Sequence, residues 1–463
     1  MAAPCSNMTR SLLSYFRLTK QRLWPVLAQS LGLCLCGLLF MAPVLAQSSD
    51  GTRHVTVVDS ETLHSALASM PQGAEIRLKP GLYRGHFHIE KPLTLIGAPG
   101  VVFDAQGVGS AIVISAPGVS ITRVTVQRWG QDLYEKDAAI RLMPGANDVA
   151  IIANRLVGPG FGVYASEVSD LRLLDNQIQG DEQTFLLDRG DGIHLLKVNH
   201  PTVRGNRISK VRDGIYLESG IGSRIYSNHL SYLQYGLHYM YTQQDEAMDN
   251  LATRVSGGYA LMNSQGIHLI ANTVQHAQEF GVLLNLTHDA KIQANQIEAT
   301  QMANSVAGDL FSEGKGLFVY GAQRNQIIGN SVTGNQIGIA MALGGEDNAV
   351  YQNQFLANTT QVRYVGEQRV EWSFQGRGNY WSDYQGWDLD GDGIGDSQHL
   401  PNDNLDRLFW LYPEARFLME SPIVKLLKWL DNQIQDEHSA GVVDSYPLMV
   451  PLNAFVPHTG EAL

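Results

Sequence analysis

The chain has 463 residues, of which 33 are basic and 45 are acidic, giving a formal net charge of −12 at pH 7. This acidic balance argues against nucleic acid and anionic membrane surfaces as partners, because both are themselves negatively charged. All three cysteines (Cys5, Cys34 and Cys36) lie within the first 46 residues, so the rest of the chain can form no disulfide.

Residues 1–46 have the pattern of a secretory signal peptide. Four basic residues and no acidic one precede an apolar run from about residue 31 to residue 45, and residues 44–46 (Val-Leu-Ala) form a plausible cleavage site. A retained membrane anchor is the alternative. Cleavage would leave 29 basic against 45 acidic side chains. The exported protein, lacking thiols, could bind a soft metal ion only through methionine and histidine.

Residues 47–375 contain a repeat of about 22 residues, in which a glycine is followed fourteen residues later by an asparagine. A fixed period in this range predicts a solenoid, in which each unit buries its apolar face against its neighbours. The pairs are Gly162/Asn176, Gly192/Asn206, Gly214/Asn228, Gly236/Asn250, Gly258/Asn272, Gly281/Asn295 and Gly316/Asn330, with Gly338/Asn353 one residue longer.

Each repeat predicts three short strands. Apolar residues alternate after each glycine, as in a half-buried strand, and others lie three residues before and two after each asparagine. No window keeps the 3.6-residue period of a helical repeat. We therefore predict an all-β chain folded as a parallel β-helix, right-handed because parallel crossovers nearly always are. The asparagines should stack as a ladder at one bend and adopt the left-handed conformation there.

The two ends of the solenoid are predicted to differ from its coils. A terminal coil has no neighbour, so a cap is needed, and Thr62 to Met70 has the pattern of a short amphipathic helix that could provide it. Residues 376–463 are predicted to form a C-terminal extension.

Two coils carry insertions in the same bend. Most coils have eight residues from the asparagine to the next glycine, but Asn176 to Gly192 takes 16 and Asn295 to Gly316 takes 21. The two loops should leave the solenoid on one side, roughly 24 Å apart at ~4.8 Å per coil, and could flank a groove. Two tolerated surface insertions are the alternative.

The strands between these insertions carry methionine, histidine and aromatic residues where a solvated face would be charged. His238 and Met240 point the same way on one strand, and Met262 follows Met240 in the next coil. Imidazole and thioether are ligands for Cu(I), which makes these three, with His194, candidate ligands for transient copper binding. A partner-facing apolar patch, or a face covered by the chain's own C-terminus, is the alternative.

Four further residues on this outward face are expected to meet a partner. They are Tyr216, Glu218, Phe318 and Tyr320.

The C-terminal extension contains a calcium-loop pattern. Asp388, Asp390, Asp392 and Asp396 supply carboxylates at positions 1, 3, 5 and 9, and Ile394 supplies a carbonyl at position 7. We expect a structural calcium ion here that locks the tail to the last coil; an Asp/Gly-rich turn is the alternative. Further on, residues 421–431 predict a short amphipathic helix whose apolar face is formed by Ile423, Leu426, Leu427 and Leu430.

The combination of these features resembles a known family. Asn379-Tyr-Trp-Ser-Asp-Tyr, the Asp/Gly loop, the 22-residue coils and the exported N-terminus are together similar to the NosD family, the periplasmic maturation proteins of nitrous oxide reductase. The resemblance implies a periplasmic β-helix attached to an ABC transporter permease and its ATPase, and a part in assembling the copper centres of nitrous oxide reductase. It implies copper transfer, in which a copper chaperone could take part, and no catalysis by this chain.

Two other functions fit a β-helix. A polysaccharide lyase, hydrolase or epimerase would place paired carboxylates, or an Arg/Lys base, on an outward strand face. Glu218 is the one outward carboxylate between the insertions, and Asp191 and Asp213 are interpreted as turn formers. A non-catalytic carbohydrate- or partner-binding protein would use Tyr216, Phe318 and Tyr320 for stacking.

Overall fold

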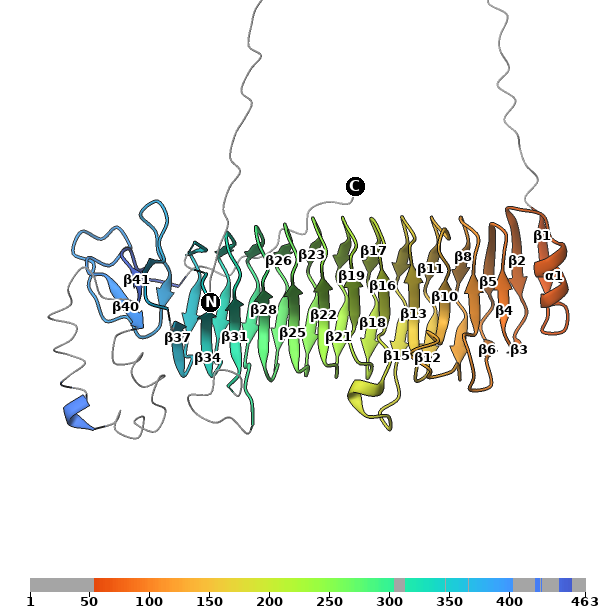
Figure 1. The fold of residues 1–463 in the computed structure, drawn as a ribbon, viewed down its shortest axis with the longest axis horizontal. Coiled ribbons are helices and arrows are strands. Elements are labelled where there is room, and N and C mark those ends of the chain that lie inside the picture. The colour runs from red at the N-terminus through yellow and green to blue at the C-terminus, as the bar shows by residue number, and fades with distance from the viewer. Residues whose placement is uncertain are drawn as a thin grey trace, which may run out of the picture. The chain divides into compact units, whose positions relative to one another are not determined.

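The computed structural model describes residues 54–303, 313–345, 347–364, 366–402, 421–424, 426 and 441–451. In this part of the chain, three parallel sheets wind into a right-handed β-helix of about 14 turns, and each coil contributes one strand to each sheet. Figure 1 shows the coils stacked in a single row. The predicted fold class is confirmed.

Sheet A has 13 strands and contains the strand that precedes each ladder asparagine. Its strands are β1 Val55–Val58, β2 Ala74–Leu78, β5 Leu93–Gly97, β8 Ser120–Thr122, β11 Ala150–Ile152, β14 Arg172–Leu174, β17 Thr202–Arg204, β20 Arg224–Tyr226, β23 Glu246–Met248, β26 His268–Ile270, β29 Lys291–Gln293, β32 Gln326–Ile328 and β35 Ala349–Tyr351.

Sheet B also has 13 strands and follows the asparagine bend. Its strands are β3 Gly81–Arg84, β6 Val101–Asp104, β9 Thr125–Gln127, β12 Arg155–Val157, β15 Gln177–Gln179, β18 Arg207–Ser209, β21 His229–Ser231, β24 Leu251–Thr253, β27 Thr273–Gln275, β30 Gln296–Glu298, β33 Ser331–Thr333, β36 Gln354–Leu356 and β39 Tyr380–Trp381. Because β39 pairs with β36, the strands of the solenoid continue beyond residue 375.

Sheet C has 12 strands. In each coil its strand follows the bend in which the two insertions occur. Its strands are β4 Phe87–Ile89, β7 Ile112–Ile114, β10 Ala138–Leu142, β13 Phe161–Ser166, β16 Ile193–Leu196, β19 Ile215–Glu218, β22 Tyr235–Met240, β25 Gly257–Met262, β28 Phe280–Asn285, β31 Lys315–Tyr320, β34 Ile337–Ala342 and β37 Thr360–Tyr364.

The core is the space that the three sheets enclose. One apolar side chain per short strand, such as Leu173, Ile178 and Ile193 in one coil, is almost fully buried there. The helix α1 Leu63–Ser69 covers the N-terminal end through Leu63 and Ala66, which confirms the predicted helical cap. None of the described helices is long and apolar enough to cross a membrane.

The repeated glycines begin strands of sheet C at a point where coils approach closely. A Cβ on Gly214 would lie 2.5 Å from the carbonyl oxygen of Gly236, and one on Gly258 would lie 2.3 Å from that of Gly281. These contacts involve backbone atoms of the next coil, so the register of the strands excludes a side chain at these positions.

The asparagines form a continuous ladder from Asn154 to Asn379. Each side-chain amide donates to the Oδ1 atom of the asparagine in the next coil, at 2.8–3.1 Å, and most also donate to a backbone carbonyl of the preceding coil. The expected left-handed conformation at the asparagine is wrong. The positive φ angle belongs to the residue before it, for example 56° at Asp175 and 55° at Asp249. With the bend made one residue earlier, the asparagine side chain points into the coil.

The ladder ends on a carboxylate from far along the chain. Asp444 Oδ2 accepts hydrogen bonds from the Asn379 backbone N–H at 2.7 Å and from Trp381 Nε1 at 2.8 Å, and Oδ1 accepts from the Tyr446 N–H at 3.1 Å. Asp444 ends β41 Gly441–Asp444, which forms a small sheet with β38 Arg369–Glu371 and β40 His399–Asn402. Burial raises the pKa of Asp444 to about 6.

The predicted C-terminal helix lies largely outside the described residues. Residues 422–424 and 426 are helical. Ile423 and Leu426 are exposed, whereas Val424 is buried. Leu427 and Leu430 belong to the part of the chain that the structure does not describe.

Asp444→Ala should destabilise the last coil, because it leaves buried donors of Asn379 and Trp381 without an acceptor, at a cost of about 2–4 kcal/mol.

The stability of the protein should also depend on pH through Asp444. Since the folded-state pKa of Asp444 is raised, its ionisation opposes folding. The free energy of unfolding should therefore fall as the pH rises from about 4 to above 6, by up to about 3 kcal/mol. Denaturation followed by tryptophan fluorescence at several pH values tests this. Asp444→Asn should lose that pH dependence; an unchanged profile would contradict the assignment.

Candidate functional site

A row of rings crosses the outward face of sheet C beside the first insertion. Tyr164, His194, Tyr216 and His238 occupy matching positions on β13, β16, β19 and β22. Successive ring centroids lie 5.0, 4.8 and 4.8 Å apart, and the first two pairs are stacked. The parallel register therefore converts residues 22 to 30 positions apart in sequence into a continuous column.

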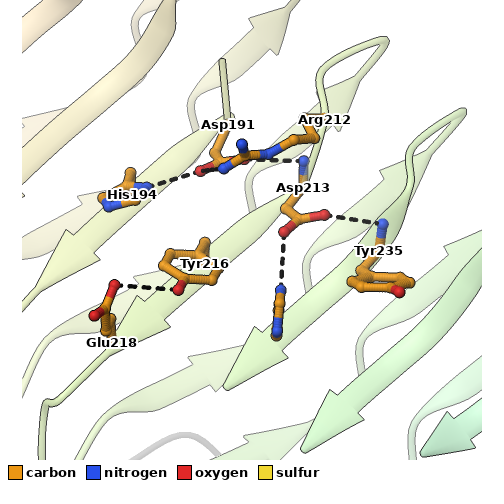
Figure 2. Close-up of polar contacts among 8 residues, drawn as sticks. Asp191, His194, Arg212, Asp213, Tyr216, Glu218 and Tyr235 are labelled. Carbon is orange, nitrogen blue, oxygen red and sulfur yellow. Dashed lines mark hydrogen bonds and ion pairs between the residues drawn. The ribbon is translucent and has the colours of Figure 1, made fainter. Parts of the chain in front are cut away.

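Each of the two imidazoles in this column is held by a buried aspartate. His194 Nδ1 lies 2.7 Å from Asp191 Oδ2 (Figure 2). His238 Nδ1 lies 2.9 Å from Asp213 Oδ2. The first pair belongs to one coil, whereas the second joins two neighbouring coils. Because a carboxylate accepts, each Nδ1 carries the proton, which leaves Nε2 of the neutral ring as a lone-pair donor.

The two aspartates differ in their charge environment. Arg212 binds Asp191 through Nε and Nη2, both at 2.9 Å. Burial opposes the ionisation of Asp191, but the bond from His194 and the charge of Arg212 outweigh it and lower the pKa of Asp191. Burial raises the pKa of Asp213, and the hydrogen bond from His238 offsets part of that rise. Asp191 is therefore a fixed negative charge beside a weaker acid.

The nearby phenols remain protonated. Burial raises the pKa of Tyr235 to about 12. Burial also raises the pKa of Tyr216, whose hydroxyl donates to Glu218 Oε2 at 3.1 Å (Figure 2). Neither phenol is suited to act as a base at neutral pH.

One nitrogen in this site has no hydrogen-bond partner among the described residues. His238 Nε2 is buried and makes no hydrogen bond within this part of the chain, although His238 as a whole remains 8% exposed. A buried lone pair without a donor is costly, and an imidazole whose Nδ1–H is held by a carboxylate is the usual form of a metal-binding histidine. The geometry thus prepares His238 Nε2 to receive a cation or a hydrogen-bond donor.

Three of the four predicted copper ligands lie on the same outward face of two neighbouring strands. Met240 and Met262 are direct neighbours in register on β22 and β25, and His238 is two residues from Met240 on the same face of β22. Both methionines are half-buried. His194 lies two strands from His238, with the Tyr216 ring between them. His194 is therefore part of the same column but not of the same cluster.

A hollow of about 310 Å³ lies in front of the ring column, and the first insertion contributes to its wall through Leu187 of the 3-10 helix η1 Leu186–Asp188. Figure 1 shows the η1 loop projecting from the row of coils. The hollow is lined by Leu187, His194, Arg212, Asp213, Tyr216, Gln234, Tyr235 and His238.

A second hollow of about 300 Å³ shares Tyr235 with the first and is lined further along by Phe280, Leu283, Phe318 and Tyr320. Two hollows in sequence along sheet C agree with the groove expected between the insertions. Most of the second insertion, residues 304–312, lies outside the described residues.

The residues expected to face a partner have different environments. Tyr216 and Glu218 are half-buried and bonded to each other. Phe318 is only 7% exposed and belongs to an apolar cluster on the outward face with Phe280 and Leu283, against which Tyr320 packs.

The predicted calcium loop brings three of its carboxylates together. Oxygens of Asp388, Asp390 and Asp392 lie within 4.8 Å of one another. Asp396 instead accepts the Leu389 N–H at 2.6 Å, and Ile394 pairs with Leu448. Backbone N–H groups, first that of Gly393, lower the pKa of Asp388.

The sequence analysis treated Asp191 and Asp213 only as turn formers and gave Arg212 no role. The two aspartates do support bends, since Asp191 accepts the Asp213 N–H and Asp213 accepts the Tyr235 N–H, but they also position the imidazoles. The available signal was an aspartate directly before the strand glycine in two consecutive coils, each followed by a ring three residues later.

Comparison with known proteins identifies the family of this chain. Residues 174–386 match the family described as "Periplasmic copper-binding protein (NosD)". A protein of Stutzerimonas stutzeri named "Probable ABC transporter binding protein NosD" is 40% identical over 81% of this chain and 86% of its own length. The chain belongs to the NosD family. A Pseudomonas aeruginosa protein of the same name is 42% identical over 80% of this chain and 87% of its own.

Solved structures share the fold with this NosD-family chain. The A-module of the Azotobacter vinelandii mannuronan C-5 epimerase AlgE6 is 15% identical, with a TM-score of 0.51 over 70% of this chain and 94% of that module. The Dettilon tailspike protein is 13% identical, with a TM-score of 0.51 over 72% of this chain and 69% of its own. At such identities the similarity concerns the β-helix alone.

Proposed function

We propose that this NosD-family chain binds Cu(I) in the periplasm through His238 Nε2 and the thioethers of Met240 and Met262. The observation that carries the proposal is His238 Nε2, which is buried and has no hydrogen-bond partner among the described residues, on the same outward face as two register-paired methionines. One nitrogen and two sulfurs form a soft ligand set that suits Cu(I), and the chain outside residues 1–46 offers no thiolate. Asp213 would orient the imidazole and increase its basicity.

The proposal extends to the role of the protein in a cell. The family description supports a periplasmic, copper-binding protein, and the names of the relatives support a transporter partner. We infer that the chain is exported by residues 1–46 and acts with an ABC permease and its ATPase. In this role it takes part in copper transfer during the maturation of nitrous oxide reductase. A copper chaperone would be the donor. It is not proposed to be an enzyme.

The Cu(I) affinity of the purified protein, measured by competition with a chromogenic chelator, tests the ligand set. His238→Ala, Met240→Ala and Met262→Ala should each weaken binding at least about tenfold, and Asp213→Asn should weaken it about 10- to 100-fold through the lost orientation of the ring. Met248→Ala is a matched control, because Met248 is a half-buried methionine on sheet A of the same coil. Unchanged affinity in the His238 and Met240 variants would exclude the site.

Affinity purification of the tagged protein from membranes of a denitrifying host tests the partners. We expect an ABC permease and an ATPase to co-purify, together with nitrous oxide reductase or a copper chaperone. Recovery of the protein alone would contradict the transporter assignment, while the copper titration would still decide the ligand set.

We also propose that the Asp388–Asp392 cluster binds Ca²⁺ and holds the tail to the last coil. The loop contacts the chain at Leu448, which pairs with Tyr380 of β39. A loop of the weak extracellular kind, with a dissociation constant of about 0.1 mM, would add about 1.4 kcal/mol of stability at about 1 mM calcium. Thermal unfolding with calcium and with excess chelator measures this. Asp390→Asn should abolish the difference, and identical curves for the parent protein would refute calcium binding.

A further inference from the structure

A third hollow lies on sheet B, away from the proposed copper site. It has a volume of about 310 Å³, crosses β12, β15, β18 and β21, and is open on the outward face of the sheet. Its polar lining consists of Arg155, Gln177, Gln179, Arg207, Ser209, His229 and Ser231, with no carboxylate among the described residues that form it.

Register places the donors of this hollow in two rows across the strands. Arg155, Gln177, Arg207 and His229 are consecutive partners in one row, and Gln179, Ser209 and Ser231 follow one another in the next. The two arginines therefore lie two strand spacings apart, roughly 10 Å between their Cα atoms.

The arginines of this hollow are uncommitted. Within the described chain, Arg155 and Arg207 form no ion pair, whereas Arg128, Arg172 and Arg212 on nearby coils each bind an aspartate. Arg155 and Arg207 therefore place two positive charges in one row, two strands apart, and none of the described residues that line the hollow is acidic. Burial and the charge of Arg207 lower the pKa of His229, as expected where positive charge is uncompensated.

The shape and chemistry of the hollow select among anions. It extends over four strands, about 14 Å by strand spacing, which is longer than a single phosphate. The described residues that line it include no tyrosine, tryptophan or phenylalanine on which a sugar ring could stack. Its glutamines and serines suit peptide groups, and in a polyproline II segment residues three apart lie on one side at about 9 Å, close to the spacing of the two arginines.

We propose that this surface of sheet B binds an extended acidic segment of a partner protein, in which two carboxylates three residues apart pair with Arg155 and Arg207. Each guanidinium would donate two parallel hydrogen bonds to one carboxylate, and the glutamines between and beside them would bond the peptide backbone. The occupied surface would lie on a different sheet from His238, so partner docking and copper binding would be separable.

Fluorescence anisotropy of a labelled Glu-Pro-Pro-Glu peptide with the purified protein tests the proposal, with Gln-Pro-Pro-Gln as the uncharged probe. Arg155→Gln and Arg207→Gln should each weaken binding about threefold and the double variant about tenfold. Arg204→Gln, an exposed arginine on sheet A, should have no effect. The pKa of His229, followed by NMR, should rise when the acidic peptide binds, and the Cu(I) affinity should stay unchanged.

Several results would overturn this assignment. Equal binding of both peptides, or of the acidic peptide to the double variant, would show that the arginines do not recognise carboxylates here. Inorganic phosphate and vesicles with anionic lipid should be tested in the same way. If either binds more tightly than the peptide and depends equally on Arg155 and Arg207, the ligand of this surface is that anion and not an acidic segment. Failure of the copper titration with intact peptide binding would refute the proposed function and leave this docking surface standing.

Discussion

The fold depends on amide-to-amide hydrogen bonding between coils. An asparagine can reach the next asparagine at about 2.9 Å only if every coil has the same path and the strands pair at their ordinary spacing. The ladder therefore enforces register, and register in turn places a glycine against the carbonyl of the next glycine, where no side chain fits. Insertions are accommodated in the bend between sheets B and C, outside this constraint.

Register is also what builds the two surfaces. Side chains at one position of successive coils become neighbours, so chemistry can be assembled from residues about 22 positions apart. On sheet C this brings Met240 beside Met262 and lets Asp213 of one coil hold His238 of the next. On sheet B it aligns Arg155 with Arg207. The outward face of sheet C thus carries methionine, histidine and apolar side chains, whereas that of sheet B carries cationic and polar ones. Both faces are built on the same β-helix and differ only in their outward residues.

The period of the sequence predicted the fold class, the alternation within strands and the neighbours of each outward residue, because all three follow from one repeat. It could not predict which residue of a bend turns left-handed, and the asparagine was wrongly chosen. It also treated Asp191 and Asp213 only as bend residues, since the direction of a bend side chain is not periodic. His194 was grouped with His238 by type, although two strands separate them.

The closure of the ladder by Asp444 has a consequence for how the chain becomes folded. The acceptor that terminates the last coil lies 65 residues after Asn379, the final asparagine of the ladder. A chain that emerges N-terminus first can stack its coils as they appear, starting from the helix α1. Its growing end nevertheless presents unpaired strand edges, which are templates for pairing with other chains, until almost the whole sequence is available. The distance between Asn379 and Asp444 thus sets how long that edge stays open during synthesis.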